Sequence, residues 1–406
     1  MSKLMQSGAI SRNYLIMTII LCWSGLVVMS SLYVTVPLIP VFADQFGITP
    51  TQASGAGSIF SLGFAVGCLM YGAISDKYGC KRVIFIGMLI LSFVSFMLGL
   101  VHSFAWIIVL RGIQGAAAAT FSPVALAYAV EMYPANRRVT AIGFISTGFL
   151  VAGIVGQIIS SIISQQYGWN TLFVLLAVVY LITSLVVWLL LPRDEIKRGK
   201  DTSIWESLLQ IGTVLKQPKL RLSYVVALVL LMSFVSMYSV LGSYLSGPEF
   251  GLSAQQILYV RAAGILGMLV SPFAGKLTQR LGVRSVLRLG LTMAVVGLAC
   301  MGFFTNLSLL ILMSLLFVTG IAVSVPSLVA LVGELGGKSR GIAVSVYAFI
   351  LFAGTSIAPI LSIQFMRSGS YLLTFLMLAL VLVIGLTAAC FIGKGTTEVT
   401  QERITS

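Results

Sequence analysis

The chain has 406 residues, of which 58% are hydrophobic and only 9% are charged, and its formal net charge is +14. Soluble domains carry about 25% charged residues, so this composition excludes a soluble enzyme or binding domain and indicates that most of the surface faces lipid. The positive charge is divided among many short segments, so no nucleic-acid partner is needed to explain it.

Apolar runs of membrane-spanning length recur along the whole chain. About 20 such residues cross a hydrocarbon core of roughly 30 Å, and backbone groups in lipid must be paired internally, which favours helices. The sequence therefore predicts an all-α integral membrane protein with twelve spans. In chain order, the predicted spans are 14–40, 52–74, 83–101, 104–130, 140–163, 170–191, 222–245, 254–274, 286–304, 307–333, 341–365 and 370–392.

The predicted spans fall into two groups of six. We predict a first half over residues 1–191, a cytoplasmic linker over 192–221 and a second half over 222–406. The linker is the longest polar segment. Residues Ile204–Leu215 within it are expected to form an amphipathic helix on the membrane surface.

The two halves repeat each other in sequence. Gly72 and Gly275 lie 203 residues apart, and so do Gly79 and Gly282. The same spacing separates Lys81 from Arg284, Pro123 from Pro326, and Glu131 from Glu334. A single offset shared by so many positions indicates duplication into two pseudo-symmetric six-helix halves. This is a known transporter architecture, with the substrate site near mid-membrane between the halves.

Lysines and arginines gather on one side of the predicted membrane, with Arg367 as the clear exception. Because the number of spans is even, both termini lie on that side. The loops on the same side are 75–82, 131–139, 192–221, 275–285 and 334–340. Loops rich in lysine and arginine stay in the cytoplasm, so both termini are predicted to be cytoplasmic.

Four segments carry a resemblance to a known family. GAISDKYGCKR, residues 72–82, resembles the signature between helices 2 and 3 of the major facilitator superfamily. LRGIQGAAAA, with Arg111 and Gln114, resembles the helix 4 signature of its proton-coupled drug antiporters, and GFLVAGIVGQ partly resembles the helix 5 signature of the antiporter branch. YVTVPLIPVFADQFG is similar to bacterial arabinose-efflux-type members. The resemblance covers the full chain and implies the major facilitator fold.

The resemblance implies a gate on the cytoplasmic side. Asp76 would cap the N-terminus of a neighbouring helix, near helix 11, and would help to hold the two halves together. Helix N-termini stabilise carboxylates, so the chemistry is suitable. Gly72 and Gly79 would permit a tight loop and a close approach of helices.

The basic residues of this segment have two interpretations. They would pair with Glu131 or with lipid phosphates, or they would serve only to set the topology. These residues are Lys77, Lys81 and Arg82.

Three positions depart from the family pattern. Cys80 stands where arginine is usual, Gly153 where the helix 5 signature has proline, and Gln279 where aspartate is frequent. The last of these lies in the second-half copy of the gate segment, so we expect the first half to hold the latch more strongly. The copy comprises Gly275, Arg280, Gly282, Arg284 and Glu334.

Two arginines lie within predicted spans. Arg111 is deep in its helix, where a charge is costly and indicates a functional role by default. Gln114 is one turn away on the same face. The resemblance implies a part for Arg111 in proton or substrate coupling, and the alternative is a structural arginine satisfied by carbonyls and Gln114. Arg261 would either bind an anionic group of the substrate or reach to the outer surface.

No aspartate or glutamate lies in the middle of any predicted span. Since exporters of cationic drugs often use such a carboxylate, we expect a neutral or anionic substrate. Polar and aromatic side chains in the helices that line the pathway in this family are further candidates, although serines often bond their own backbone and tyrosines often lie at the interface. They are Tyr33, Thr35, Tyr128, Ser236, Tyr238, Tyr244 and Tyr347.

These observations predict a monomeric carrier of the bacterial inner membrane that works by alternating access. It would export a drug, sugar or metabolite, and the family resemblance implies that inward proton flow drives export. The expected partners are a small-molecule substrate, protons and membrane lipid. The alternatives are a proton-independent facilitator or exchanger, and a non-transporting membrane sensor.

The sequence predicts neither catalysis nor a cofactor. The five cysteines and the single His102 show no metal-ligand or disulfide spacing. A phosphate-binding GxxxxGK[ST] loop is also missing, so we expect no ATP-driven pump and no enzyme.

The predicted topology can be tested with reporter fusions. Green fluorescent protein fused after Ser406 should fluoresce, because it folds in the cytoplasm. Alkaline phosphatase fused after His102 should be active, because that loop is predicted to face outward. The reverse pattern would contradict the predicted orientation.

Overall fold

The structure, a computed structural model, describes residues 2–194 and 211–393. Within these residues, twelve helical stretches are long and apolar enough to cross a membrane, which confirms the predicted all-α, twelve-span fold. The predicted linker helix over Ile204–Leu215 falls largely outside the described residues, although 211–215 are helical.

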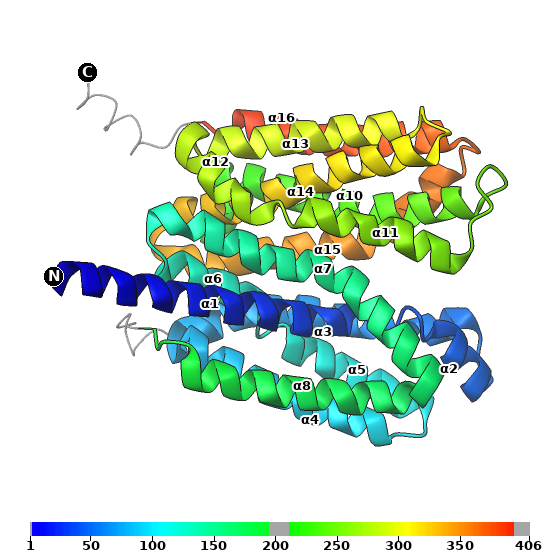
Figure 1. Cartoon of the computed structure of the whole chain (residues 1–406), viewed down its shortest axis with the longest axis horizontal. Coiled ribbons are helices and arrows are strands. Elements are labelled where there is room, and N and C mark those ends of the chain that lie inside the picture. The colour runs from blue at the N-terminus through cyan, green and yellow to red at the C-terminus, as the bar shows by residue number, and fades with distance from the viewer. Residues whose placement is uncertain (1, 195–210, 394–406) are drawn as a thin grey trace.

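The helices form two groups, one in the lower part and one in the upper part of Figure 1. The first half contains α1 (Ser2–Tyr33), α2 (Ile39–Phe46), α3 (Pro50–Tyr78), α4 (Cys80–Leu100), α5 (Phe104–Ala118), α6 (Ser122–Met132), α7 (Ala135–Tyr167) and α8 (Trp169–Leu190). The second half contains α10 (Pro218–Ser246), α11 (Ala254–Met268), η1 (Ser271–Phe273), α12 (Ala274–Leu281), α13 (Val283–Met301), α14 (Leu307–Leu335), η2 (Gly337–Ser339), α15 (Arg340–Met366) and α16 (Tyr371–Phe391).

The helices α3 and α11 begin in the same way. The side chain of Gln52 accepts a 2.9 Å hydrogen bond from the backbone N–H of Thr49, and the Thr49 hydroxyl accepts one from the N–H of Gln52. Ser253 and Gln256 repeat this arrangement at the start of α11. Such a capping box satisfies two N–H groups that lack partners at a helix start. The two helices occupy equivalent places in the two halves.

The gate segment is more helical than the sequence predicts. α3 continues through Asp76 to Tyr78, and α4 starts at Cys80, so Gly79 alone connects them. Gly79 has a φ of 89°, which glycine adopts without a steric penalty. The predicted loop over 75–82 is therefore wrong, because the helical hydrogen bonding continues past the end of the apolar run. The predicted loop over 275–285 is wrong for the same reason.

Three predicted spans contain breaks. The span 14–40 ends as a helix at Tyr33, the span 104–130 is broken ahead of Pro123, and the span 254–274 is broken ahead of Pro272. Proline lacks an N–H and clashes with the preceding turn, which favours a break there. Pro326 nevertheless lies inside the continuous helix α14, so proline alone does not decide where a helix breaks.

The packing of the two halves follows the sequence repeat. In the first half α1 packs on α7, α4 on α8 and α3 on α5; the corresponding pairs in the second half are α10 with α15, α13 with α16 and α11 with α14. Between the halves, α3 packs on α15, and α7 packs on α11 and α12. Figure 1 shows α7 and α15 along the boundary between the two groups.

The two ends of the molecule differ. We call the end that holds the start of α1, the end of α16 and the Gly79 and Gly282 turns the basic end, and the end that holds α2 the distal end (Figure 1). At the basic end the helices of the two halves are in contact. Towards the distal end, two cavities lie between the halves, and a third, of about 650 Å³, lies at the basic end beside α1, α7 and α12.

Candidate functional site

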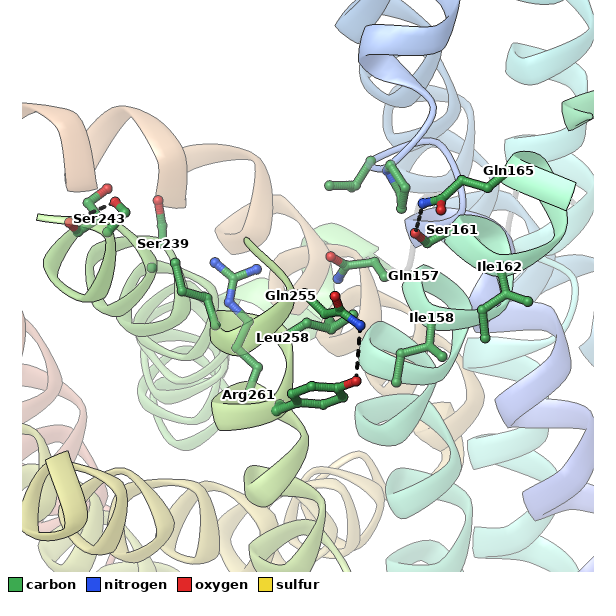
Figure 2. A pocket seen from close by; sticks show the side chains of 16 residues that line it. Gln157, Ile158, Ser161, Ile162, Gln165, Ser239, Ser243, Gln255, Leu258 and Arg261 are labelled. Atoms are coloured by element: carbon green, nitrogen blue, oxygen red, sulfur yellow. Dashed lines mark hydrogen bonds between the residues drawn. The ribbon is translucent and has the colours of Figure 1, made fainter. Parts of the chain in front are cut away.

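A cavity of about 800 Å³ lies between α7 of the first half and α10 and α11 of the second (Figure 2). Three of its polar lining residues, Gln165, Ser246 and Gln255, are exposed and lie near helix ends, so the cavity opens at the distal end. The described lining residues are Val36, Pro37, Gln157, Ile158, Ser161, Ile162, Gln165, Ser239, Gly242, Ser243, Ser246, Gln255, Ile257, Leu258, Tyr259 and Arg261.

Arg261 projects from α11 into this cavity. Figure 2 shows its guanidinium group pointing into the space between the halves, on the side of Ser239. Its Nη2 donates a 2.9 Å hydrogen bond to the backbone carbonyl of Tyr238. Among the described residues that line the cavity, Arg261 alone is charged. The guanidinium group therefore lies in a cavity between the halves, a position compatible with the first of the two alternatives from the sequence.

Three glutamine side chains lie farther away, on the side of the guanidinium group that faces α7 (Figure 2). Gln157 donates to the carbonyl of Gly153 at 2.6 Å, Gln165 donates to Ser161 at 2.9 Å, and Gln255 donates to Tyr259 at 3.1 Å (Figure 2). Amide groups are donors and acceptors, so they can rotate to accept or donate toward a bound molecule. The sequence patterns did not single out these glutamines, because nothing in a linear pattern shows which face of α7 meets α11.

A second cavity, of about 660 Å³, lies beside the first and shares Val36 with it. It lies between α1 and α3 on one side and α10 and α15 on the other. Tyr33 and Thr35, both candidates from the sequence, line this cavity together with Thr355 and Ser356. Its described lining carries no charged residue.

Arg111 lies behind the wall of the second cavity and is fully buried. Its Nε donates to the carbonyl of Ala56 at 3.2 Å, its Nη1 donates to Gln114, and its guanidinium lies 4.3 Å from the centre of the Phe60 ring. Its Nη2 lies 3.5 Å from the hydroxyl of Thr35, which does face the cavity. The cation is thus stabilised by neutral dipoles and an aromatic face, and a single residue separates it from the cavity.

Five of the candidates from the sequence line neither cavity: Ser236, Tyr244 and Tyr347 are buried, and Tyr128 and Tyr238 are turned elsewhere. Tyr128 is buried and donates a 3.0 Å hydrogen bond to the carbonyl of Pro192, at the basic end. The hydroxyl of Tyr238 lies against Gly264 of α11. Neither side chain lines the two cavities described above, because each is turned towards a neighbouring helix or chain segment.

The basic end is closed by contacts between the halves. A methyl group on Gly72 of α3 would overlap the hydroxyl of Ser345 in α15, and one on Gly275 of α12 would overlap the hydroxyl of Thr140 in α7. These glycines are partners in the 203-residue repeat. Each half therefore brings the same glycine close to a helix of the other half.

The polar groups beside these glycines also cross the boundary. The carboxylate of Asp76 lies against Gly341, in the first turn of α15. Its repeat partner, Gln279, donates to the backbone carbonyl of Asn136, in the first turn of α7. Of these two repeat partners, Asp76 brings a negative charge to a helix N-terminus, where it is favoured by the helix dipole, and Gln279 does not.

The basic residues of the gate segment have different surroundings. The ammonium group of Lys81 lies 5.5 Å from the centre of the Trp188 ring, and that of Lys77 lies 5.7 Å from the Tyr78 ring. Arg82 is exposed. The remaining predicted gate residues also lie at the basic end: Glu131 at the end of α6, Arg280 and Gly282 at the end of α12, Arg284 in the first turn of α13, and Glu334 at the end of α14.

Asp194 is a gate-region residue that the sequence analysis missed. Its carboxylate accepts hydrogen bonds from the backbone N–H groups of Cys80 and Lys81, the latter at 3.2 Å, and so caps α4. Asp194 follows the end of α8, on the same side of the membrane as the Gly79 turn. A carboxylate that follows a helix ending on this side of the membrane could have suggested a capping role in the sequence. Only the packing of α8 on α4, however, brings Asp194 to the N-terminus of α4.

Comparisons with known proteins decide the family. A family profile described as the Major Facilitator Superfamily matches residues 21–271 and 249–404. The chain belongs to this superfamily. It is 27% identical to the uncharacterized MFS-type transporter YybF of Bacillus subtilis, over 80% of each chain. It is 28% identical to the multidrug resistance protein MdtG of Serratia proteamaculans, over 66% of each chain.

A solved structure supports the same fold. The structure is similar to that of the Escherichia coli fucose:proton symporter FucP, with a TM-score of 0.76 and 15% identity, over 94% of this chain and 100% of that chain. Membership of the superfamily makes the protein a multi-pass secondary transporter with a small-molecule substrate. It also confirms the prediction that the chain is not an enzyme.

Replacing Asp76 by asparagine should slow transport by about fivefold, the equivalent of the roughly 1 kcal/mol that a carboxylate gains at a helix N-terminus. The initial rate of substrate flux in cells with matched expression is the measurement. Gln279→Ala is the control, because it removes a neutral contact at the equivalent place. Equal losses in the two variants would contradict a charge-dependent latch.

Replacing Asp194 by alanine should destabilise the protein by about 1 kcal/mol, since α4 loses its N-terminal cap. The melting temperature of the purified protein in detergent is the measurement. Asp194→Asn should lie between the wild type and Asp194→Ala, because asparagine keeps only one of the two oxygens that accept these hydrogen bonds and lacks the charge that a helix N-terminus favours. An unchanged melting temperature in Asp194→Ala would show that the cap does not contribute.

Proposed function

We propose that the protein exports a small molecule by proton-coupled alternating access, and that the substrate is neutral or anionic. The observation that carries this proposal is a difference between the two ends: two adjoining cavities lie between the halves towards the distal end, whereas at the basic end Gly72 and Gly275 bring each half against the other, beside a separate cavity at α1, α7 and α12. Such contacts between the halves at the basic end are what a carrier needs in order to open its central cavities at the distal end. Rocking of the two halves about the central cavities would exchange the accessible side.

The repeat supports such a movement. The contacts Gly72–Ser345 and Gly275–Thr140 are related by the repeat, so one rotation about the axis between the halves would separate both. Both halves belong to one chain, so a monomer is sufficient. In this proposal the basic end faces the cytoplasm of a bacterium and the distal end faces outward, as the lysines and arginines indicate.

Coupling to protons and the outward direction rest on other observations. The relative MdtG is named a multidrug resistance protein, and Arg111 with Gln114 lies in a segment similar to the helix 4 signature of proton-coupled antiporters. Arg111 is buried one residue away from the cavity, a position suited to responding to charge in the cavity. A proton-independent facilitator or exchanger and a non-transporting sensor are the alternatives.

The absence of acidic residues from the lining supports the proposed substrate charge. Neither cavity has an aspartate or glutamate among its described lining residues, and one of them contains Arg261. A cationic drug would meet a repulsive charge in that cavity without a compensating carboxylate.

Proteoliposomes provide the test of proton coupling. The purified protein should release or take up protons, detected with an internal pH-sensitive dye, when compounds from a panel of organic acids and neutral drugs are added. An imposed pH gradient should accelerate flux of the active compounds severalfold, and a protonophore should abolish that acceleration. The Asp76→Asn variant serves as a control with impaired gating.

Two outcomes would favour the alternatives. Flux that is independent of the pH gradient would support a facilitator or exchanger. Binding without flux in either direction would support a sensor.

A further inference from the structure

Arg261 is fixed in the cavity wall by a reciprocal fit of α10 and α11. A methyl group on Gly242 of α10 would overlap Nη2 of Arg261, and a methyl group on Gly264 of α11 would overlap the hydroxyl of Tyr238. Each helix therefore inserts one side chain into a glycine notch of the other. The hydrogen bond from Nη2 to the Tyr238 carbonyl adds a third constraint. The guanidinium group is held in position before any substrate arrives.

The charge of Arg261 has no acidic partner in the described part of the chain. The hydrogen bond to the Tyr238 carbonyl is the only one that its side chain makes there, and its buried Nε has none. Glu249, in the loop before α11, lies beside Tyr244 instead. A cation that is partly removed from water and lacks a counter-charge attracts an anion, and low-dielectric walls strengthen the attraction.

We propose that the substrate is an amphipathic organic acid whose carboxylate binds to Arg261. The guanidinium group has planar donors that match a carboxylate, and this arrangement gives both strength and direction. Ser239 and Ser243 lie one turn apart on α10, on the same side of the cavity as Arg261, and present hydroxyl donors (Figure 2). A single cation suits a single negative charge.

The other residues that line the cavity indicate that the part of the substrate attached to its carboxylate is apolar. Pro37, Ile158, Ile162 and Leu258 provide apolar surface in the same cavity. An apolar group joined to the carboxylate would cover this surface and gain the free energy of burial. A small hydrophilic acid would leave it exposed to water.

The same molecule would contact both halves of the protein. Arg261, Ser239 and Ser243 belong to the second half, whereas Gln157 and Ser161 come from α7 of the first. Figure 2 shows these two sets on opposite sides of the cavity. An acid held by Arg261 therefore lies where closure of the distal end would bring the first half onto it. The proposal rests on the transport function proposed above and narrows its substrate to this class.

Matched pairs of acids and amides test the proposal on the purified full-length protein. The pairs are benzoate with benzamide, 2-naphthoate with 2-naphthamide, and octanoate with octanamide. Affinity is measured from the rise in melting temperature with ligand concentration, which requires neither a membrane nor a gradient. At least one acid should bind tenfold or more tightly than its amide. Failure of every acid to bind, or equal binding of acids and amides, would overturn the proposal.

Variants of Arg261 test whether its charge is responsible for the preference for acids over amides. Arg261→Gln should lower the affinity of the acid at least tenfold and leave that of the amide unchanged, and Arg261→Lys should lie between, because it keeps the charge without the planar donors. Arg367→Gln is the matched control, since Arg367 is an exposed arginine whose side chain bonds only to Gln364 among the described residues. If Arg261→Gln does not fold, the acid preference of the wild type and its expected reduction in Arg261→Lys still test the proposal. A retained acid preference in Arg261→Gln would refute the assignment.

The binding assay and the proteoliposome assay can refute the two proposals independently of each other. Acid binding that depends on Arg261, without proton-dependent flux, would support this site and refute proton-coupled export. Proton-dependent flux of neutral compounds that is unaffected by Arg261→Gln would support export and refute this substrate class.

Discussion

In the hydrocarbon core of a bilayer, no water is available to pair with backbone N–H and C=O groups, and this constraint shapes the whole molecule. It makes every spanning segment a helix, and it makes each buried charge costly. The two arginines within the spans meet that cost differently. Arg111 is enclosed by Ala56, Gln114 and Phe60, whereas Arg261 faces an open cavity. The first is satisfied by the protein itself, and the second leaves a positive charge towards the cavity.

Glycine notches are the device by which these helices approach one another closely. At the basic end, Gly72 and Gly275 bring each half against a helix of the other. At the distal end, Gly242 and Gly264 lock α10 onto α11 within the second half. Small residues let helices pack where lipid provides no hydrophobic drive for association. The same packing feature thus closes one end of the pathway and holds the proposed binding residue at the other.

Two carboxylates lie on either side of the Gly79 turn and act on different helices. Asp76 reaches α15 of the other half, and Asp194 caps α4 of its own half. A rocking movement of the halves would separate Asp76 from α15 and leave Asp194 in place. The Gly79 turn would then move as part of a rigid first half. Of the two carboxylate contacts, the one between Asp76 and α15 would be broken by this movement, and the one between Asp194 and α4 would be kept.

The sequence by itself determined the membrane class, the twelve helices and the twofold repeat, because hydrophobic length and a constant 203-residue offset are properties of the linear chain. The tertiary structure decided which side chains meet. Tyr128 and Arg261 are both polar groups in apolar runs, yet one is turned to Pro192 and the other to a cavity. Helix rotation and the packing of α8 on α4, which also pairs Asp194 with Cys80, depend on contacts between segments far apart in the chain, and no local pattern records them.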